Sequence, residues 1–302
     1  MKKATPAPID SISVLHRLLG LPSPLHPLIS MIDNTKIAVA IDQLPQSFLL
    51  SFYKISFKKL LKGRIGYGQG YYDYDEGGLV FTAPHQIISI ENDTEFFGAT
   101  LLIHPDFIRN YPLGKNIKNY GFFSYEANEA LHLSEKERAT ILDILEQINT
   151  ELNNPIDDFS QDVMISYIEV LLNYSNRYYK RQFITRKAVN HDLLTKMEQL
   201  LNDYFDSADA LKKGLPSVEY LAEQLHLSPR YLSDMLRSLT GQNAQQHIHE
   251  KLIEKAKEKL SGTGLSVSQI AYELGFEHPQ SFSKLFKIKT NQSPLEFRQL
   301  FN

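Results

Sequence analysis

Nine polar residues near the C-terminus fall into two groups, each spaced like the exposed face of a short helix. The first group is Arg230, Ser233, Asp234 and Arg237, and the second is Gln280, Ser281, Ser283, Lys284 and Lys287. Apolar residues alternate with each group at helical spacing, which predicts two amphipathic helices. Guanidinium, amide, hydroxyl and carboxylate groups can bind base edges in the DNA major groove, and cationic groups bind phosphates. We therefore take these residues as candidates for DNA binding.

The sequence around the two groups repeats. Ser217–Leu225 matches Ser266–Leu274 at an offset of 49 residues, and the offset becomes 50 from Pro229 and Pro279 onward. Each copy has a first helix with a central alanine, a short turn, and a proline where a second helix begins. Two copies are fewer than a solenoid needs. The pattern is typical of a helix-turn-helix, although a helical bundle with a solvated polar face has the same periodicity.

Charge supports the DNA interpretation only locally. The whole chain of 302 residues has a net charge of −3, which is not typical of a nucleic-acid-binding protein. However, the stretch from His278 to Leu295 has no acidic residue and contains Lys284, Lys287 and Lys289. The second repeat therefore has the stronger positive face.

The first half of the chain has a strand pattern that gives way to helices. We predict strands over 36–41, 48–57, 79–81, 87–90 and 97–103, separated by Gly-rich turns, as in an all-β barrel or sandwich. Ser134 and Glu137 form a capping-box pattern at the start of a helix that ends near Asn153. A second helix is predicted over 158–179. This hairpin either covers the barrel or exposes an apolar stripe to a partner chain.

The C-terminal motifs resemble the AraC/XylS family of transcription regulators. The resemblance covers about 85–100 residues and rests on 266–276, 281–287 and 293–298, together with 228–233 and Thr240-Gly241. The helix over 244–260 is similar to the one that joins two helix-turn-helix units in that family. The resemblance implies that Arg230, Ser233 and Asp234, and then Gln280, Ser281, Ser283 and Lys284, contact bases, while Arg237 and Lys287 contact phosphates.

Asp234 departs from the family pattern, in which its position is often basic. A carboxylate accepts a hydrogen bond from cytosine N4 but is repelled by phosphate. Either the first unit prefers a cytosine-containing site, or it binds DNA weakly and the second unit supplies most of the affinity.

The N-terminal part is similar in outline to a cupin-like sensor domain, mainly over 71–81 and at Pro84. Four of its residues are candidates for a small-molecule pocket, with an ordinary core role as the alternative: Arg64, Tyr67, Tyr72 and Tyr74. Enzymatic cupins hold a metal with a His-x-His pair, but this region offers only His85. We therefore expect no metal, no cofactor and no catalytic residues.

The predicted fold class is α+β multidomain, with an N-terminal all-β cupin-like barrel, a helical hairpin and a C-terminal all-α double helix-turn-helix domain. The expected boundaries are 1–133 for the sensing domain with its N-terminal arm, 134–182 for the hairpin, 183–192 for a linker and 193–302 for the DNA-binding domain. The predicted function is that of a cytoplasmic bacterial transcription regulator.

We expect this regulator to bind double-stranded promoter DNA as a homodimer, with a small-molecule effector, and to contact RNA polymerase if it is an activator. No membrane segment is expected, because no apolar run approaches the length of a span. The alternatives are a dimeric regulator without a ligand and, from another class, a cupin-type enzyme with an appended helical domain.

Overall fold

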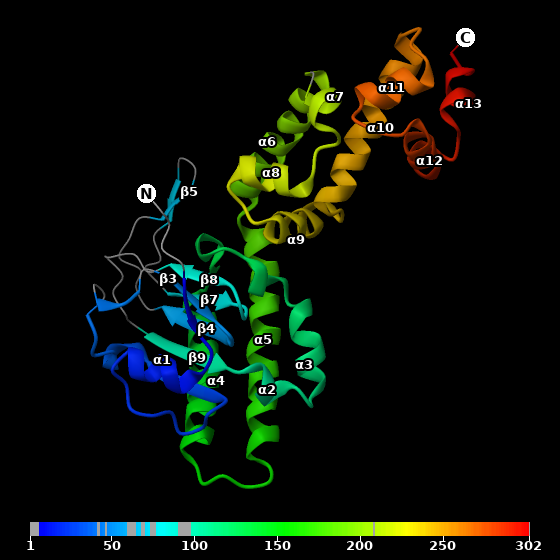
Figure 1. Ribbon diagram of the computed structural model, residues 1–302. Helices are drawn as coiled ribbons and strands as arrows, with labels where there is room; N and C mark the ends of the chain where they lie inside the picture. The colour runs from blue at the N-terminus through cyan, green and yellow to red at the C-terminus, as the bar shows by residue number, and fades with distance from the viewer. Residues whose placement is uncertain are drawn as a thin grey trace. The chain divides into compact units, whose positions relative to one another are not determined.

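The computed structural model describes residues 6–40, 43–45, 47–58, 65–67, 70–72, 77–89, 98–207 and 209–301. The chain divides into two compact units, Met1–Gln182 and Phe183–Asn302 (Figure 1). The predicted class is confirmed: strands lie in the first unit and the second is helical. None of the described helices is long and apolar enough to cross a membrane.

The strands described in the first unit form separate sheets. Five strands pair in the order β10-β7-β4-β9-β2, and three pair in the order β1-β3-β8. A third pairing joins β5 and β6. The bounds are β1 Ala7–Ile9, β2 Ile29–Asp33, β3 Ser47–Leu50, β4 Tyr53–Lys58, β5 Ile65–Tyr67, β6 Gly70–Tyr72, β7 Gly78–Thr82, β8 Ile87–Ser89, β9 Gly98–Ile103 and β10 Leu131–His132. The expected closed barrel is therefore not formed by the described strands, and β2 is left at a sheet edge.

The core of the first unit is an apolar cluster to which both large sheets and helix α1 (Ile12–Leu18) contribute. Its members include Ile12, Ile32, Phe48, Phe52 and Leu102, all at most 5% exposed. The side chain of Ser11 caps α1 by accepting a hydrogen bond from the Val14 N–H. Packing between α1 and the two sheets thus buries apolar side chains that a closed barrel would hold in its interior.

The strand predicted over 36–41 is wrong. The carboxylate of Asp33 accepts a hydrogen bond from the Thr35 N–H (3.1 Å) and caps a 3₁₀ turn, Asn34–Lys36. The strand lies just upstream, as β2, where five residues pair antiparallel with β9. Local turn chemistry at Asp33 therefore ends the strand where the β-branched pattern suggested that one begins.

The central strand β4 carries a half-buried lysine. Lys54 stands in register with Thr82 of β7 and Leu102 of β9. Burial, and to a smaller extent the charge of Lys58, lowers the pKa of Lys54 from 10.5 to about 8. The charged form of Lys54 is thus less stable in the folded protein than in water.

Two helices form the predicted hairpin. α4 (Glu135–Asn153) begins at the predicted capping box of Ser134 and Glu137, and its buried side chains are Ile141, Ile144, Leu145 and Ile148. α5 (Ser160–Thr185) packs against the five-stranded sheet, where the Tyr179 ring lies 6.3 Å from the Phe81 ring of β7. The hairpin covers the sheet. Three apolar side chains near its tip and along α5 are exposed nonetheless: Phe159 (70%), Val163 (37%) and Val170 (40%).

α5 continues six residues beyond its predicted end at Tyr179. The polar run after that residue is held by hydrogen bonds: Arg181 Nε donates to Glu137 Oε1 (3.0 Å), and the Gln182 side chain accepts from the His132 N–H (2.8 Å). The stretch expected as a linker, 183–192, accordingly lies at the end of α5 and the start of α6.

Helices form the whole of the second unit as described. They are α6 Lys187–Asp206, α7 Asp209–Lys213, α8 Val218–Leu225, α9 Pro229–Thr240, α10 Ala244–Gly262, α11 Val267–Glu273, α12 Pro279–Thr290 and α13 Pro294–Arg298. The predicted joining helix is confirmed as α10, with Ile248, Leu252, Ala256 and Leu260 buried along one face. It runs from the first repeat to the second and contacts helices of both.

Candidate nucleic-acid interface

The first repeat positions α9 through its cap and its apolar face. The Ser228 hydroxyl accepts a hydrogen bond from the Tyr231 N–H (3.2 Å), and Pro229 takes the first helical position. Such a cap and proline favour helix initiation at this residue. The inward face of α9 buries Tyr231, Leu232, Met235 and Leu236. These contacts leave the polar face of α9 toward solvent.

The second repeat positions α12 in the same way. Pro279 opens the helix, and Phe282 and Phe286 are completely buried. The Phe282 ring packs edge-to-face against Phe276 (5.5 Å between centroids), the Phe286 ring does so against Phe297 (5.6 Å), and the two rings are tilted against each other at 5.8 Å. Leu285, expected to point inward, is only partly buried.

Hydrogen bonds show that the sequence repeat is also a structural repeat. The Leu227 N–H donates to the Ala222 carbonyl (2.8 Å), and the Phe276 N–H donates to the Ala271 carbonyl (3.0 Å), at the predicted offset of 49. At the far ends, the Thr240 and Thr290 hydroxyls donate to carbonyls four residues earlier. Both repeats therefore have the same helix-turn-helix architecture.

The turn of the second repeat requires glycine. Gly275 has φ of +92°, in the left-handed region that a helix end often adopts, and a Cβ there would lie 2.6 Å from the Gly214 carbonyl carbon. In the first repeat, His226 occupies the left-handed position with φ of 55°. Gly275 thus allows close contact with the segment after α7, and the first repeat lacks this constraint.

Asp234 bridges the two arginines of α9. Arg230 Nε lies 3.0 Å from Asp234 Oδ2, and Arg237 Nη1 lies 3.2 Å from Asp234 Oδ1. The Asp234 side chain is 17% exposed, while both arginines are about half exposed. Residues three or four apart are neighbours on the surface of a helix, so the spacing in the sequence already indicated both ion pairs. Sequence reasoning instead assigned Asp234 a possible base contact.

The exposed face of α12 is not neutralised in this way. Gln280, Ser281, Lys284 and Lys287 are exposed and Ser283 is partly buried. None of the described acidic side chains lies within ion-pair distance of the α12 lysines. The two candidate helices therefore differ: α9 presents two arginines tied to a carboxylate, and α12 presents lysines without one.

A shallow depression of about 350 Å³ lies along α9. Arg230, Ser233, Asp234 and Arg237 line it together with residues of α8 and the start of α10. All four first-repeat candidates thus share one surface. Ser233 lies beside the two arginines and is partly exposed.

The four ligand candidates of the N-terminal unit fall largely outside the described residues. Arg64 and Tyr74 are not among those residues. Tyr67 and Tyr72 end strands β5 and β6, of which only the backbone is described. Their role stays a prediction. No group of three or more described His, Asp or Glu residues is arranged to hold a metal ion.

Comparison with known proteins agrees with the repeat. Residues 221–300 match a family model described as a helix-turn-helix domain. YfiF of Bacillus subtilis, named as an uncharacterized HTH-type transcriptional regulator, is 24% identical over 83% of this chain and 78% of its own length. RhaS of Salmonella newport, named as an HTH-type transcriptional activator, is 33% identical over 40% of this chain and 41% of its own length.

One solved structure aligns with most of the chain. ToxT from Vibrio cholerae is 14% identical, and the alignment covers 83% of this chain and 87% of that one with a TM-score of 0.31.

Proposed function

We propose that this chain, whose C-terminal unit carries a helix-turn-helix domain of the AraC type, binds specific promoter sequences as a transcription regulator in the bacterial cytoplasm. The observation that carries the proposal is the pair of structurally equivalent helices, α9 and α12, each fixed by a buried face and presenting a polar one. A helix of this width fits the major groove, where its exposed side chains reach base edges.

The two helices have different tasks in this proposal. Gln280, Ser281, Ser283 and Lys284 of α12 contact bases, and Lys287 contacts phosphate, because neither lysine forms an ion pair with a described carboxylate. In the first unit, Arg230 and Ser233 contact bases and Arg237 contacts phosphate. Asp234 acts as a positioning residue that orients both arginines. The second unit supplies most of the electrostatic attraction, since phosphate contacts dominate affinity for DNA.

We assign the N-terminal unit to dimerisation, small-molecule sensing or both. The exposed apolar side chains of Phe159, Val163 and Val170 on and beside α5 favour contact with a second copy of the hairpin. Two weak DNA-binding halves gain affinity when they are tethered. If the protein is an activator, RNA polymerase is a further partner. A ligand-independent dimeric regulator is the alternative.

The test is selection of genomic DNA fragments by the purified full-length protein across a salt series. The proposal predicts a shared motif with two elements about one helical turn apart, about 34 Å, and an affinity that falls steeply with salt. The double variant Lys284→Ala/Lys287→Ala, changed only on the exposed face of α12, should recover no motif. Equal retention of unrelated sequences by wild type and variant would contradict the assignment.

Dimerisation is tested separately. The variant Val163→Glu/Val170→Glu places two carboxylates on the exposed stripe of α5 and should shift the mass measured by light scattering from dimer to monomer. The variant Gln147→Glu/Thr150→Glu changes two exposed polar positions on α4, outside that stripe, and shows the effect of added charge alone. A monomeric wild type, or a dimer that survives the Val163/Val170 change, would remove α5 from the interface.

A further inference from the structure

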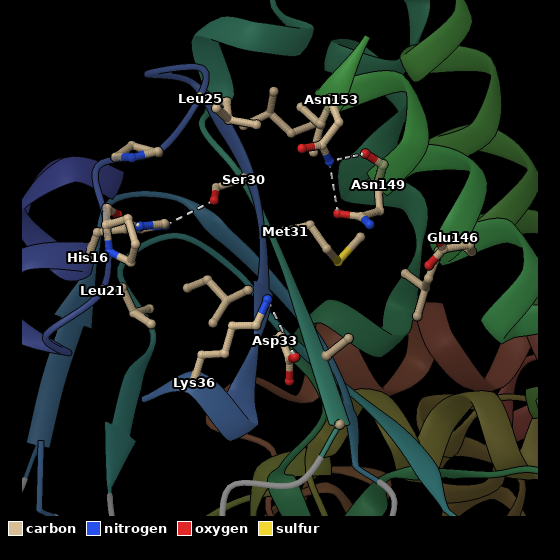
Figure 2. A pocket seen from close by; sticks show the side chains of 18 of the residues that line it. His16, Leu21, Leu25, Ser30, Met31, Asp33, Lys36, Glu146, Asn149 and Asn153 are labelled. Carbon is tan, nitrogen blue, oxygen red and sulfur yellow. Dashed lines mark hydrogen bonds and ion pairs between the residues drawn. The ribbon is translucent and has the colours of Figure 1, made fainter. Parts of the chain in front are cut away.

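A cavity of about 630 Å³ surrounds the open edge of β2 in the N-terminal unit. Its walls come from the chain after α1, from β2, from the start of β9 and from the second half of α4 (Figure 2). This volume is within the range of small-molecule sites.

The cavity wall combines aliphatic with polar side chains, and part of it faces water. Leu25 is 68% exposed and Leu142 is 40% exposed, although both are large aliphatic residues. The Met31 side chain extends from β2 toward α4, where Glu146 and Asn149 lie (Figure 2). A bound molecule with an apolar body would cover these side chains and remove them from water.

One wall is fixed by a buried histidine. His16 Nδ1 lies 2.6 Å from the Pro22 carbonyl, and His16 Nε2 lies 2.9 Å from the Ser30 hydroxyl. Because a carbonyl only accepts, Nδ1 carries a proton, and in the neutral ring Nε2 accepts from Ser30. His16 therefore ties the segment after α1 to β2, and its ring has no remaining capacity for a ligand.

The polar groups of the cavity favour a cation. Asp33 is already engaged, because its carboxylate accepts from the Thr35 N–H and hydroxyl and lies 3.9 Å from Lys36 Nζ. Glu146 is different: among the described residues it has no hydrogen bond or ion pair. Its carboxylate stands on the cavity wall as an available acceptor.

The end of α4 adds to this preference. Asn149, Leu152 and Asn153 line the cavity from the last turn of α4, and that turn contains no basic residue. The carbonyl end of a helix carries partial negative charge, which stabilises a nearby cation. Glu146 and the carbonyl end of α4 therefore both favour a cationic ligand and disfavour an anionic one.

We infer that this cavity is an effector site for a small amphipathic amine, whose ammonium group faces Glu146 and whose hydrocarbon part covers Met31, Leu25 and Leu142. The inference rests on the proposed function only in calling the ligand an effector. Binding between β2 and α4 places the ligand against the hairpin that we assign to dimerisation, which gives it a route to influence assembly.

The experiment uses full-length protein labelled with ¹³C at the methionine methyl groups. The chain has five methionines, and of the four that the structure describes Met31 alone lines the cavity; Met31→Leu assigns its signal. The probes are n-hexylamine, n-hexanol and n-hexanoate at pH 7.5, which share one hydrocarbon chain and differ in charge. We expect hexylamine to shift the Met31 signal saturably, hexanol to bind more weakly and hexanoate to leave it unchanged.

Three variants test the chemistry of the site. Glu146→Gln should weaken hexylamine binding at least about threefold, as expected for a partly exposed charge-assisted contact. Leu142→Lys, which puts a cation at the mouth, should abolish it. Asp143→Asn removes the same charge from an exposed α4 position outside the cavity and should change nothing. Both cavity variants alter exposed positions, so folding is expected to persist, and the signal of Met164, a buried residue of α5 in the same unit, verifies it.

The outcomes separate this inference from the DNA-binding proposal. An unchanged Met31 signal, equal binding of hexanoate, or full affinity in Glu146→Gln would overturn the amine site. None of these readings involves DNA. Loss of motif recovery in the DNA selection would instead reject the proposed function and leave the cavity result intact.

Discussion

Replacement of Asp234 by asparagine tests whether this residue restrains the arginines of α9. The change removes one negative charge from the candidate DNA face and releases Arg230 and Arg237 from ion pairs of 3.0 and 3.2 Å. Because the arginines are about half exposed, the two pairs together contribute under about 1 kcal/mol to folding. The variant is therefore expected to fold, with little change in its thermal midpoint by circular dichroism.

The effect on DNA is larger than the effect on folding. Each additional phosphate contact steepens the dependence of log affinity on log salt by about 0.9. Between 50 and 200 mM salt, one such contact changes affinity by about 3.5-fold. If both freed arginines reach phosphates, Asp234→Asn should bind a random-sequence duplex about threefold to tenfold more tightly at 50 mM salt, with a slope steeper by one to two contacts.

Fluorescence anisotropy with a labelled random duplex and a salt series measures both quantities. Asp192→Asn, an exposed acid-to-amide change on α6 outside both repeats, shows the effect of net charge alone. An unchanged slope would mean that Asp234 does not restrain the arginines. Weaker binding, confined to cytosine-containing sites, would show that Asp234 accepts a hydrogen bond from a base and that our revised role for it is wrong.

Three further predictions follow from individual positions. Gly275→Ala should lower the free energy of unfolding by about 3 kcal/mol or more, because its Cβ would lie 2.6 Å from the Gly214 backbone. Gly241 is also left-handed but has open space around it, so Gly241→Ala should lower the same free energy by only about 1 kcal/mol. Urea unfolding of both variants checks the contrast. Lys287→Ala should flatten the salt slope for DNA by about one contact, and Lys284→Ala should weaken binding to the selected motif more than binding to a random duplex. An unaltered slope for the first variant, or an unaltered preference for the second, would take that lysine off the interface. Lys54→Met should raise the free energy of unfolding at pH 7.5 by about 1 to 3 kcal/mol. The lowered pKa of Lys54 makes the stability of the wild type rise with pH between about 8 and 10.5. The stability gained by Lys54→Met should therefore shrink toward pH 10. A gain that does not change with pH would exclude the lysine charge as its cause.

Some site features were predictable from the sequence and others were not. The equivalence of α9 and α12 follows from the repeat, and the left-handed Gly275 follows from its place after a helix. The bridging role of Asp234 was readable from its spacing to Arg230 and Arg237, but the same spacing also placed it on the face that meets DNA. Only the geometry shows that both of its oxygens are engaged.

The sequence by itself determined the features that depend on neighbours in the chain. The caps at Ser134 and Ser266 and the amphipathic faces of α9, α10 and α12 arise from contacts within about four residues, so residue order is enough to specify them.

Tertiary structure decided what depends on distant partners. α5 continues through a polar run because Arg181 and Gln182 find Glu137 and His132 about 50 residues earlier. The division of the strands into separate sheets likewise joins segments far apart in the sequence, such as β2 and β9, and the cavity between β2 and α4 joins segments more than 100 residues apart. No local pattern encodes such pairings, because the free energy that selects them comes from burial that exists only once the chain has folded.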